Sequence, residues 1–352
     1  PHLWKNLPSM LLNKNGSLVI DWFYVVTHLP WAIRFLRNCT SARAEHIAKS
    51  LSSFSSQARL AYEEIFDDVD VLNNIVHKEP IFLYESKKLF EQNQYAFNLR
   101  KKYDVQFVVI NKEEIAKIEP SLEPIYYNGV VLKGESFTNS PLEITQKIFN
   151  NFIKNDGHFI KIKIKSIVQK DNSLFLKYEK KEQQFDKIVV AAGVWSNMLA
   201  RTIGDNFPLD TERGYHIVFE NNNNLLTHPV GWAKTGFYMT PMKDGIRVAG
   251  TVEIAGLKKP MNKNMLSMIE KTARRILPQL GKVKSDWMGF RPTLPDSLPV
   301  VGESKKCKNV YYAFGHQHLG LSLAAITGKV IQSLIENRTS NINIDALNPY
   351  RF

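Results

Sequence analysis

The stretch Ile188-Val-Val-Ala-Ala-Gly-Val-Trp-Ser196 decides the fold of this 352-residue chain. It completes a nearly unbroken apolar run from Phe185, which is typical of a strand buried on both faces of a parallel sheet. The run ends in Ala191, Ala192 and Gly193, whose small side chains let a backbone approach a ligand closely. Ligands of open α/β sheets bind beyond the carboxyl ends of the strands. The stretch therefore predicts a ligand-binding turn, with an ordinary strand-to-helix turn as the alternative.

The segments on either side of this strand divide the chain into parallel and antiparallel parts. Residues 157–200 and 291–337 have the strand and helix patterns of one parallel sheet, whereas residues 206–290 form short strands with turns, typical of an antiparallel sheet. We predict a mixed α/β fold, in which an interrupted Rossmann-like domain carries an inserted antiparallel substrate domain. The expected division assigns 1–80, 126–205 and 291–352 to the first domain, and 81–125 and 206–290 to the second.

Local patterns place the individual elements within this division. Ser140, Pro141 and Glu143 are the residues expected at the cap, first and third positions of a helix. The lengths of the apolar runs and their periodicity predict the other elements. We expect helices at 50–74, 95–103, 113–118, 263–277 and 322–337, and strands at 81–84, 129–132, 157–164, 166–169, 174–178 and 310–313.

A loop rich in proline follows the antiparallel part: Gly289-Phe-Arg-Pro-Thr-Leu-Pro-Asp-Ser-Leu-Pro-Val-Val-Gly302. Its prolines restrict the backbone, so that Arg291 would be a fixed guanidinium able to bind a carboxylate through two hydrogen bonds. The alternative is a surface arginine that pairs with Asp296.

A hairpin is predicted over residues 236–251, where a Lys-Asp-Gly turn separates two strands. Strand alternation places Phe237 and Met239 on one face and Tyr238 and Thr240 on the other. The hydroxyl of Tyr238 is therefore a candidate to contact a substrate, and a tyrosine of the core or its rim is the alternative.

The last motif is Tyr312-Ala-Phe-Gly-His-Gln-His-Leu-Gly-Leu-Ser322, which leads into a helix. Backbone N–H groups at such a turn and helix start stabilise negative charge. His316 and His318 alternate here, but no further His or acidic residue lies near them in the sequence, so we expect no metal site.

The net charge of +12 comes from lysines scattered over the chain, which favours solvated faces over a nucleic-acid site. Residues 18–37 combine five aromatic side chains with Arg34 and Arg37. A helix packed on a domain and a basic amphipathic segment on a membrane surface both explain this pattern. No run of 18 or so apolar residues predicts a membrane span. Cys39 and Cys307 lie too far apart in the sequence to predict a disulfide framework or a zinc site.

In this order and spacing, the four motifs resemble the D-amino-acid oxidase family of flavoenzymes, in particular the bacterial D-amino-acid and D-hydroxyproline dehydrogenases. The similarity covers nearly the whole chain, and the stretch Leu11-Leu-Asn-Lys-Asn-Gly-Ser-Leu18 also resembles those dehydrogenases. The resemblance implies FAD as the cofactor and an FAD-binding role for the interrupted domain.

The resemblance also implies roles for residues. Ala192, Gly193 and Trp195 would line the adenosine side of FAD, while Arg291 would bind the substrate carboxylate and Tyr238 would lie over the substrate pocket. The turn Arg213-Gly214-Tyr215 matches a family turn that enters the substrate domain. The surroundings of the isoalloxazine ring and its ribityl chain would be formed by Gly315, His316, Leu319, Gly320, Leu321 and Ser322.

One feature of the family is absent from the sequence. The family begins with a strand, a GxGxxG turn that holds the pyrophosphate, and a helix, which together need roughly 30 residues. No GxGxxG occurs in the chain, and nothing before Leu11 could supply the unit. We therefore expect either a fragment or a protein that has lost the unit, with weak FAD binding or none.

The implied reaction is hydride transfer from the Cα–N bond of a D-amino acid to flavin, giving an imine that hydrolyses to a 2-oxo acid and ammonia. The alternatives are oxidation of a sarcosine-like or D-hydroxyproline-like secondary amine and a non-catalytic remnant that cannot hold FAD. Oxygen or a membrane quinone would accept the electrons. The expected location is the cytoplasm, with peripheral contact at the inner face of the membrane, and nucleic acid is not an expected partner.

Overall fold

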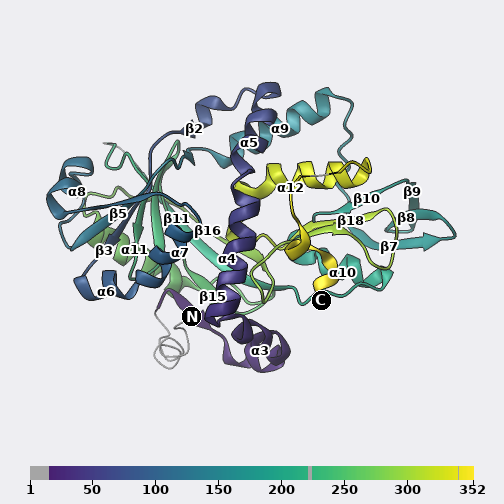
Figure 1. The fold of residues 1–352 in the computed structure, drawn as a ribbon, viewed down its shortest axis with the longest axis horizontal. Coiled ribbons are helices and arrows are strands. Elements are labelled where there is room, and N and C mark those ends of the chain that lie inside the picture. Colours follow the sequence, from purple (N-terminus) through teal and green to yellow (C-terminus); the bar gives the residue numbers. More distant parts are fainter. Residues whose placement is uncertain (1–15, 221–223, 340) are drawn as a thin grey trace.

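The computed structural model describes residues 16–220, 224–339 and 341–352. It consists of two halves, each built on its own sheet, with the helices α4 (Ser41–Ser55) and α5 (Ala58–Asp68) running between them as a column (Figure 1). The mixed α/β fold with a large antiparallel part agrees with the sequence prediction. Of the Leu11–Leu18 stretch, residues 11–15 lie outside the described residues.

The larger sheet has ten strands within the described residues, and most of its neighbouring pairs are antiparallel. β11 forms the longest ladder with β16 and also pairs with β14 and β15, as the sequence pattern of 206–290 predicts. Along its path the order is β1 (Leu18–Ile20), β15 (Val252–Ile254), β11 (Asp210–Phe219), β14 (Gly245–Ala249), β13 (Phe237–Met242), β12 (Val230–Trp232), β3 (Ile81–Tyr84), β5 (Asn128–Leu132) and β4 (Phe107–Ile110), with β16 (Val283–Thr293) beside β11.

One face of this sheet is covered along its length by a core that includes α11 (Lys263–Ile276), whereas the opposite face has a smaller core at the β3–β5–β4 end, around Tyr84, Phe97 and Val130. Tyr215, Ile217 and Phe219 on β11 point to the first face and pack against Ile269 and Ala273 of α11. Strand alternation places the even-numbered side chains of β11 on the opposite face. This second face is the one that carries the candidate site.

The smaller half contains the sheet β10 (Ile188–Val190), β18 (Val310–Phe314) and β17 (Val300–Glu303), in that order. The pair β10–β18 is parallel, as predicted, but β10 has only three residues because Phe185 ends a separate strand, β9 (Lys181–Phe185). Helix α12 (Gly320–Ile335) packs with α4 and α5 over β17 and β18. The other face packs on β7 (Ile164–Lys170), β8 (Ser173–Tyr178) and α10 (Ser196–Ala200).

The strand predicted at 157–164 is wrong except for its last residue. β7 begins at Ile164, and residues 157–163 have no strand partner in the described part of the chain. The sequence has the alternation of a strand, but alternation does not supply a neighbouring strand to complete the ladder. Phe159 and Ile160 are consequently exposed.

The sheets also show how strands distribute between the halves. β5 pairs with β3 and β4, and β1 pairs with β15, so both lie in the larger sheet although the expected boundaries assign them to the other domain. Arg291 likewise lies on β16 of the larger sheet. We therefore propose boundaries that move residues 18–20, 128–132 and 291–293 to the half with the larger sheet.

The helix predictions hold apart from one. The 50–74 helix is wrong in extent, because α4 ends at Ser55, α5 ends at Asp68 and a 3-10 turn follows at Leu72–Asn74. Ser140 caps α9 as predicted, with its Oγ accepting from the backbone N–H of Glu143 at 3.4 Å. The remaining helices are α2 (Trp22–Thr27), α3 (Leu29–Asn38), α6 (Lys87–Gln92), α7 (Gln94–Lys102), α8 (Lys112–Ile118) and α9 (Pro141–Lys154); the short strands β2 (Ile75–Val76) and β6 (Phe137–Thr138) pair with each other.

One helical stretch, Gln317–Ile335, is long and apolar enough to cross a bilayer by length and composition. One helix of this kind is weak evidence for a membrane span, so it does not contradict the prediction of no span. Leu323, Ile326 and Val330 of this stretch are buried in the core of the smaller half, and the core helices of soluble proteins pass the same test.

Candidate functional site

Arg291 lies on the face of the larger sheet opposite α11. It stands opposite Glu212 on β11, and its Nη1 donates a hydrogen bond to the carbonyl oxygen of Thr251 at 2.9 Å. No acidic side chain of the described residues forms an ion pair with it. A guanidinium has five N–H donors, so most of them are free to bind a carboxylate.

The alternative partner, Asp296, is engaged elsewhere. Its Oδ2 accepts from Nε of Arg351 at 2.7 Å, and both side chains are largely buried. The structure therefore does not support the interpretation of Arg291 as one half of a surface ion pair.

Two glycines opposite each other make room for the side chains of the site. Gly214 and Gly289 are partners in the β11–β16 ladder. A Cβ on Gly214 would lie 2.5 Å from Cζ of Arg291, and a Cβ on Gly289 would lie 1.8 Å from the indole of Trp287. The guanidinium and the indole thus lie over a strip of bare backbone, which only glycine permits at this distance.

His216 extends this surface. Its ring stacks on the indole of Trp287 with centroids 5.1 Å apart. Burial, aided by the positive charge of Arg247, lowers the pKa of His216 to about 4. The imidazole is therefore neutral near pH 7, and the two rings form an uncharged wall beside Arg291.

Glu212 is the acidic side chain nearest to Arg291 in the ladder. Burial raises the pKa of the Glu212 carboxyl, and the charge of Arg291 acts in the opposite direction. Burial in turn lowers the pKa of Arg291, with Glu212 opposing it. Since a guanidinium remains protonated at every physiological pH, Arg291 is a permanent cation at the site.

Tyr238 lies on the same face as Arg291, but three strands away. The ladders connect it through Ala249 on β14 and His216 on β11 to the row of Trp287. Its ring packs edge-on against Phe82 at 5.1 Å, and burial raises its pKa to about 12. No contact between Tyr238 and Arg291 occurs in the described structure, so the two share a face without meeting.

The smaller half brings two turns to the same end of its sheet. Val190 pairs with Tyr312, and three residues beyond each of them stand Gly193 and Gly315. Both glycines have positive φ, at 56° and 85°. A Cβ on Gly193 would point into open space, whereas one on Gly315 would lie 2.6 Å from Cδ1 of Leu294.

The residues after these glycines reach the larger sheet. Trp195, which is half exposed, contacts the ring of Phe290 edge-on at 6.4 Å, and Phe290 is the neighbour of Arg291. Burial, with a further contribution from the charge of Arg291, lowers the pKa of His318. The two turns and the arginine therefore border one region between the halves.

The start of α12 has the chemistry of an anion site. Leu319 is the cap residue and provides no side-chain hydrogen bond to the first helical N–H groups. Gly320 follows it, and Leu321 and Ser322 are exposed. His316 stays on the inner side, where its Nε2 lies 2.9 Å from Oγ1 of Thr327 and burial lowers its pKa to about 4.

These features fit a bound dinucleotide. A glycine turn without obstruction at Gly193 and a helix start without a side-chain cap are suited to a flavin nucleotide at the strand ends of an α/β sheet. Trp195 would lie on the adenosine side and Gly315 to Ser322 on the flavin side, next to Arg291. Among the described residues, no group of three or more His, Cys, Asp or Glu side chains could hold a metal ion.

Sequence reasoning missed Trp287, His216 and Glu212. The strand pattern assigns alternate residues to opposite faces, but it does not say which strands are neighbours or in which register. Gly214 and Gly289 both occur in the quoted motifs. Two glycines on strands of one predicted sheet were the sequence signal that could have indicated this surface.

Two parallel strands that end in glycine turns, beside a larger sheet with an arginine that has no ion-pair partner among the described residues, are consistent with a flavin-dependent oxidoreductase. The family model for FAD-dependent oxidoreductases, DAO, matches residues 14–334. The chain is 31% identical over 360 residues to a D-amino-acid oxidase of Bradyrhizobium diazoefficiens, covering 100% of this chain and 85% of that protein. The chain therefore belongs to the DAO family of FAD-dependent oxidoreductases, with FAD as its cofactor.

Other similar proteins agree with this assignment. A D-amino acid dehydrogenase of Paramagnetospirillum magneticum is 24% identical over 330 residues, which cover 92% of this chain and 78% of that protein. The solved structure of glycine oxidase from Geobacillus kaustophilus superposes with a TM-score of 0.75 at 18% identity, covering 86% and 82% of the two chains. L-proline dehydrogenase from P. horikoshii gives 0.74 at 17% identity, covering 85% and 82%. At these identities the two structures establish the fold alone.

Proposed function

We propose that the chain oxidises the Cα–N bond of a D-amino acid, with Arg291 binding the substrate carboxylate. The observation that carries this proposal is the partly buried guanidinium of Arg291, which has no ion-pair partner among the described residues. The named relatives that act on D-amino acids support the choice of substrate class.

Arg291 would fix one end of the substrate. A guanidinium binds a carboxylate through two parallel hydrogen bonds, which orients the Cα atom as well as holding it. The positive charge also disfavours a second cation nearby, so it lowers the pKa of the substrate ammonium group. A neutral amine is the form whose lone pair assists the loss of hydride from Cα.

The wall of Trp287 and His216 would keep water away from the substrate. Neither ring carries a charge at neutral pH, because burial keeps the pKa of His216 at about 4. An environment with little water strengthens the contact between Arg291 and the carboxylate. FAD, when bound, supplies the hydride acceptor. The imine product then hydrolyses in water to a 2-oxo acid and ammonia.

The proposed role of Tyr238 follows from its separation from Arg291, which lies three strands away in the same sheet. Because Tyr238 and Arg291 share a face but do not touch, we propose that Tyr238 contacts the far end of a substrate or closes the pocket over it. We likewise propose that the cofactor is contacted by Ala192, Gly193, Trp195 and the residues from Gly315 to Ser322.

The test is kinetic. In the FAD-loaded protein, Arg291→Ala should lower kcat/KM for D-alanine by about 30-fold to 1000-fold, the equivalent of roughly 2–4 kcal/mol. Arg275→Ala is the matched control, since Arg275 is an exposed arginine of α11 that pairs with Glu85 away from the site. An unchanged kcat/KM in Arg291→Ala would contradict the proposed role of Arg291.

The same assay identifies the class of substrate and the electron acceptor. A panel of D-alanine, D-proline, sarcosine and L-alanine distinguishes a D-amino-acid enzyme from one that acts on secondary amines. Oxygen consumption compared with reduction of a quinone analogue identifies the acceptor. A folded protein that stays colourless after incubation with FAD would favour the non-catalytic alternative.

A further inference from the structure

The helices α2 and α3 expose an apolar stripe on the outside of the molecule. Its members are Trp22, Phe23 and Val26 on α2 and Leu29 and Ile33 on α3. Phe23 and Val26 are 82% and 69% exposed, and the other three are about half exposed. Neither helix contains a buried residue. Such a continuous exposed patch marks an interaction surface rather than scattered surface residues.

The spacing of these residues gives the stripe a direction. Trp22 and Val26 are four residues apart, as are Leu29 and Ile33, so each pair lies on one side of its helix. The next residue at this spacing on α3 is Arg37. The apolar stripe therefore ends in a cation on the same side of the helix. Figure 1 shows α3 at the lower edge of the molecule, outside both sheets.

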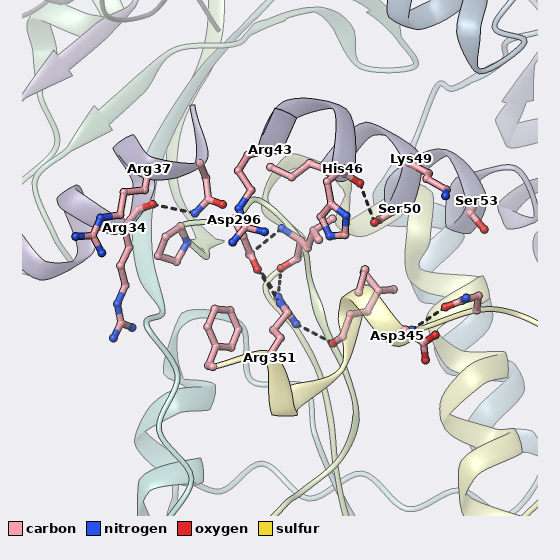
Figure 2. Close-up of a pocket in the computed structure, with 18 residues that line it drawn as sticks. Arg34, Arg37, Arg43, His46, Lys49, Ser50, Ser53, Asp296, Asp345 and Arg351 are labelled. Atoms are coloured by element: carbon pink, nitrogen blue, oxygen red, sulfur yellow. Dashed lines mark hydrogen bonds and ion pairs between the residues drawn. The ribbon is translucent and has the colours of Figure 1, made fainter. Parts of the chain in front are cut away.

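A basic pocket adjoins the stripe. It has a volume of about 770 Å³, and its lining includes Arg34, Arg37, Arg43 and Lys49 from α3 and α4. Figure 2 shows Arg34 and Arg37 at one end of the pocket, apart from the ion pair between Asp296 and Arg351.

These four cations have no anion of their own. Among the ion pairs of the described residues, none involves Arg34, Arg37, Arg43 or Lys49. Of the two acids that line the pocket, Asp296 is held by Arg351, and Asp345 leaves the lining with an excess of positive charge. Four unpaired positive charges beside an exposed apolar stripe are complementary to a surface that offers both hydrocarbon and negative charge.

We propose that this surface docks on an anionic phospholipid bilayer, with the α2–α3 stripe at the acyl boundary and the four cations on the headgroup phosphates. An amphipathic helix binds in this way, through buried apolar area and attraction to anionic lipids. Each Lys or Arg near such a surface contributes on the order of 1 kcal/mol. The proposal concerns a docking surface and is independent of the reaction assigned to Arg291.

Vesicle sedimentation tests the proposal without use of the catalytic activity. The whole chain is mixed with vesicles of phosphatidylcholine and phosphatidylglycerol in equal parts, and with vesicles of phosphatidylcholine alone. We expect binding to the mixed vesicles, much weaker binding to the neutral ones, and loss of binding as salt is raised, because salt screens surface charge.

Two variants separate the contributions. Arg34→Gln with Arg37→Gln should weaken partitioning about 30-fold, from two charges. Phe23→Asp with Val26→Asp should abolish it. The matched controls are Lys180→Gln with Lys181→Gln for charge, and Leu72→Asp with Leu142→Asp for exposed apolar residues. All four replace exposed side chains, and circular dichroism confirms that each variant is folded.

Several results would overturn the proposal. One is that the unaltered chain fails to sediment with the mixed vesicles at low salt. Another is that the control variants lose as much binding as the test variants. A third is that the basic pocket binds soluble glycerol phosphate while the chain binds no vesicles. This result would rule out the bilayer as the ligand and indicate a small-molecule anion site.

Discussion

The two halves of this protein differ in the size of their sheets and in the length of their strand ladders. In the larger half, Ile217, Phe237 and Ile246 are buried in a continuous core, and the long ladder of β11 and β16 carries the candidate site. In the smaller half, β10 is bordered by a strand on only one edge within the described part of the chain. Val189 of this strand is exposed, although strands of parallel sheets are usually covered.

The proposed substrate site and the proposed cofactor site therefore depend on separate parts of the structure. Arg291, Gly214 and Gly289 are held by ladder hydrogen bonds between β11 and β16. Gly193 and Gly315, by contrast, lie beyond the ends of the short β10–β18 ladder. Because its ladder is longer, we expect the surface around Arg291 to be the more rigid of the two. Three measurements test this contrast.

The largest expected effect is in the larger half, at the buried Arg213. Its Nη1 donates to Glu253 at 2.8 Å, and Glu253 also accepts from Tyr215 and Asn262. Arg213→Ala would leave a buried carboxylate without its cation, so the free energy of unfolding should fall by about 3–5 kcal/mol. Urea denaturation measures this loss.

Its control is Lys234→Ala, which removes an exposed partner of Glu85 and should cost at most about 1 kcal/mol. Hydrogen exchange then compares β11 with β18. If both strands lose protection equally in Arg213→Ala, the halves unfold as one unit and the contrast between them fails.

An intermediate effect is expected in the smaller half, at Gly315. Its φ of 85° strains any other residue, and a Cβ would meet Leu294 at 2.6 Å. Gly315→Ala should cost about 1–3 kcal/mol and weaken FAD retention, measured by equilibrium dialysis with flavin absorbance.

Gly328→Ala is the matched control on α12. No atom lies within 4 Å of the position where its Cβ would stand. Alanine there should stabilise the helix by about 1 kcal/mol and leave FAD retention unchanged. Equal loss of FAD in both variants would show that Gly315 has no particular role in the turn.

The smallest effect concerns pH. The pKa of His216 falls to about 4 in the folded state, from an ordinary value of 6.5. Between these values the unfolded chain binds a proton that the folded chain does not, so stability should decrease as pH falls from about 6.5 to about 4. The contribution of one partly buried histidine is about 1 kcal/mol.

His216→Gln should flatten this part of the stability profile, as followed by urea midpoints across the same pH range. His316→Gln provides the comparison in the smaller half, since burial lowers the pKa of His316 to a similar value. A profile that does not change in His216→Gln would mean that the imidazole is not shielded by Trp287 as described.

Much of the fold could be predicted from local patterns. The hairpin at Lys243 and Asp244, the cap at Ser140 and the parallel pair of β10 and β18 depend on turn chemistry and hydrophobic periodicity, which act over a few residues. Arg291 was singled out because prolines and glycines surround it in the sequence, but it lies on β16 and not in the predicted loop.

The remaining features depend on contacts between distant segments. Phe159 has the pattern of a strand but no partner in the described residues, and a sequence pattern cannot report the absence of a neighbour. The surroundings of Arg291 arise from the register of β11 and β16, which sets Gly214 against Gly289 and His216 against Trp287. Register is fixed by packing across the sheet, and a shift by one residue would turn every one of these side chains to the other face.

The positions of Trp195 and Trp287 have a practical consequence. Both indoles are about half exposed; Trp195 packs edge-on against Phe290 of β16, and Trp287 of the same strand stacks on His216. Indole emission overlaps flavin absorption, so energy transfer to a bound flavin would quench both. The protein thus carries its own fluorescent reporter. A decrease in tryptophan fluorescence on addition of FAD would measure how much of the cofactor site is occupied, without a label and without an activity assay.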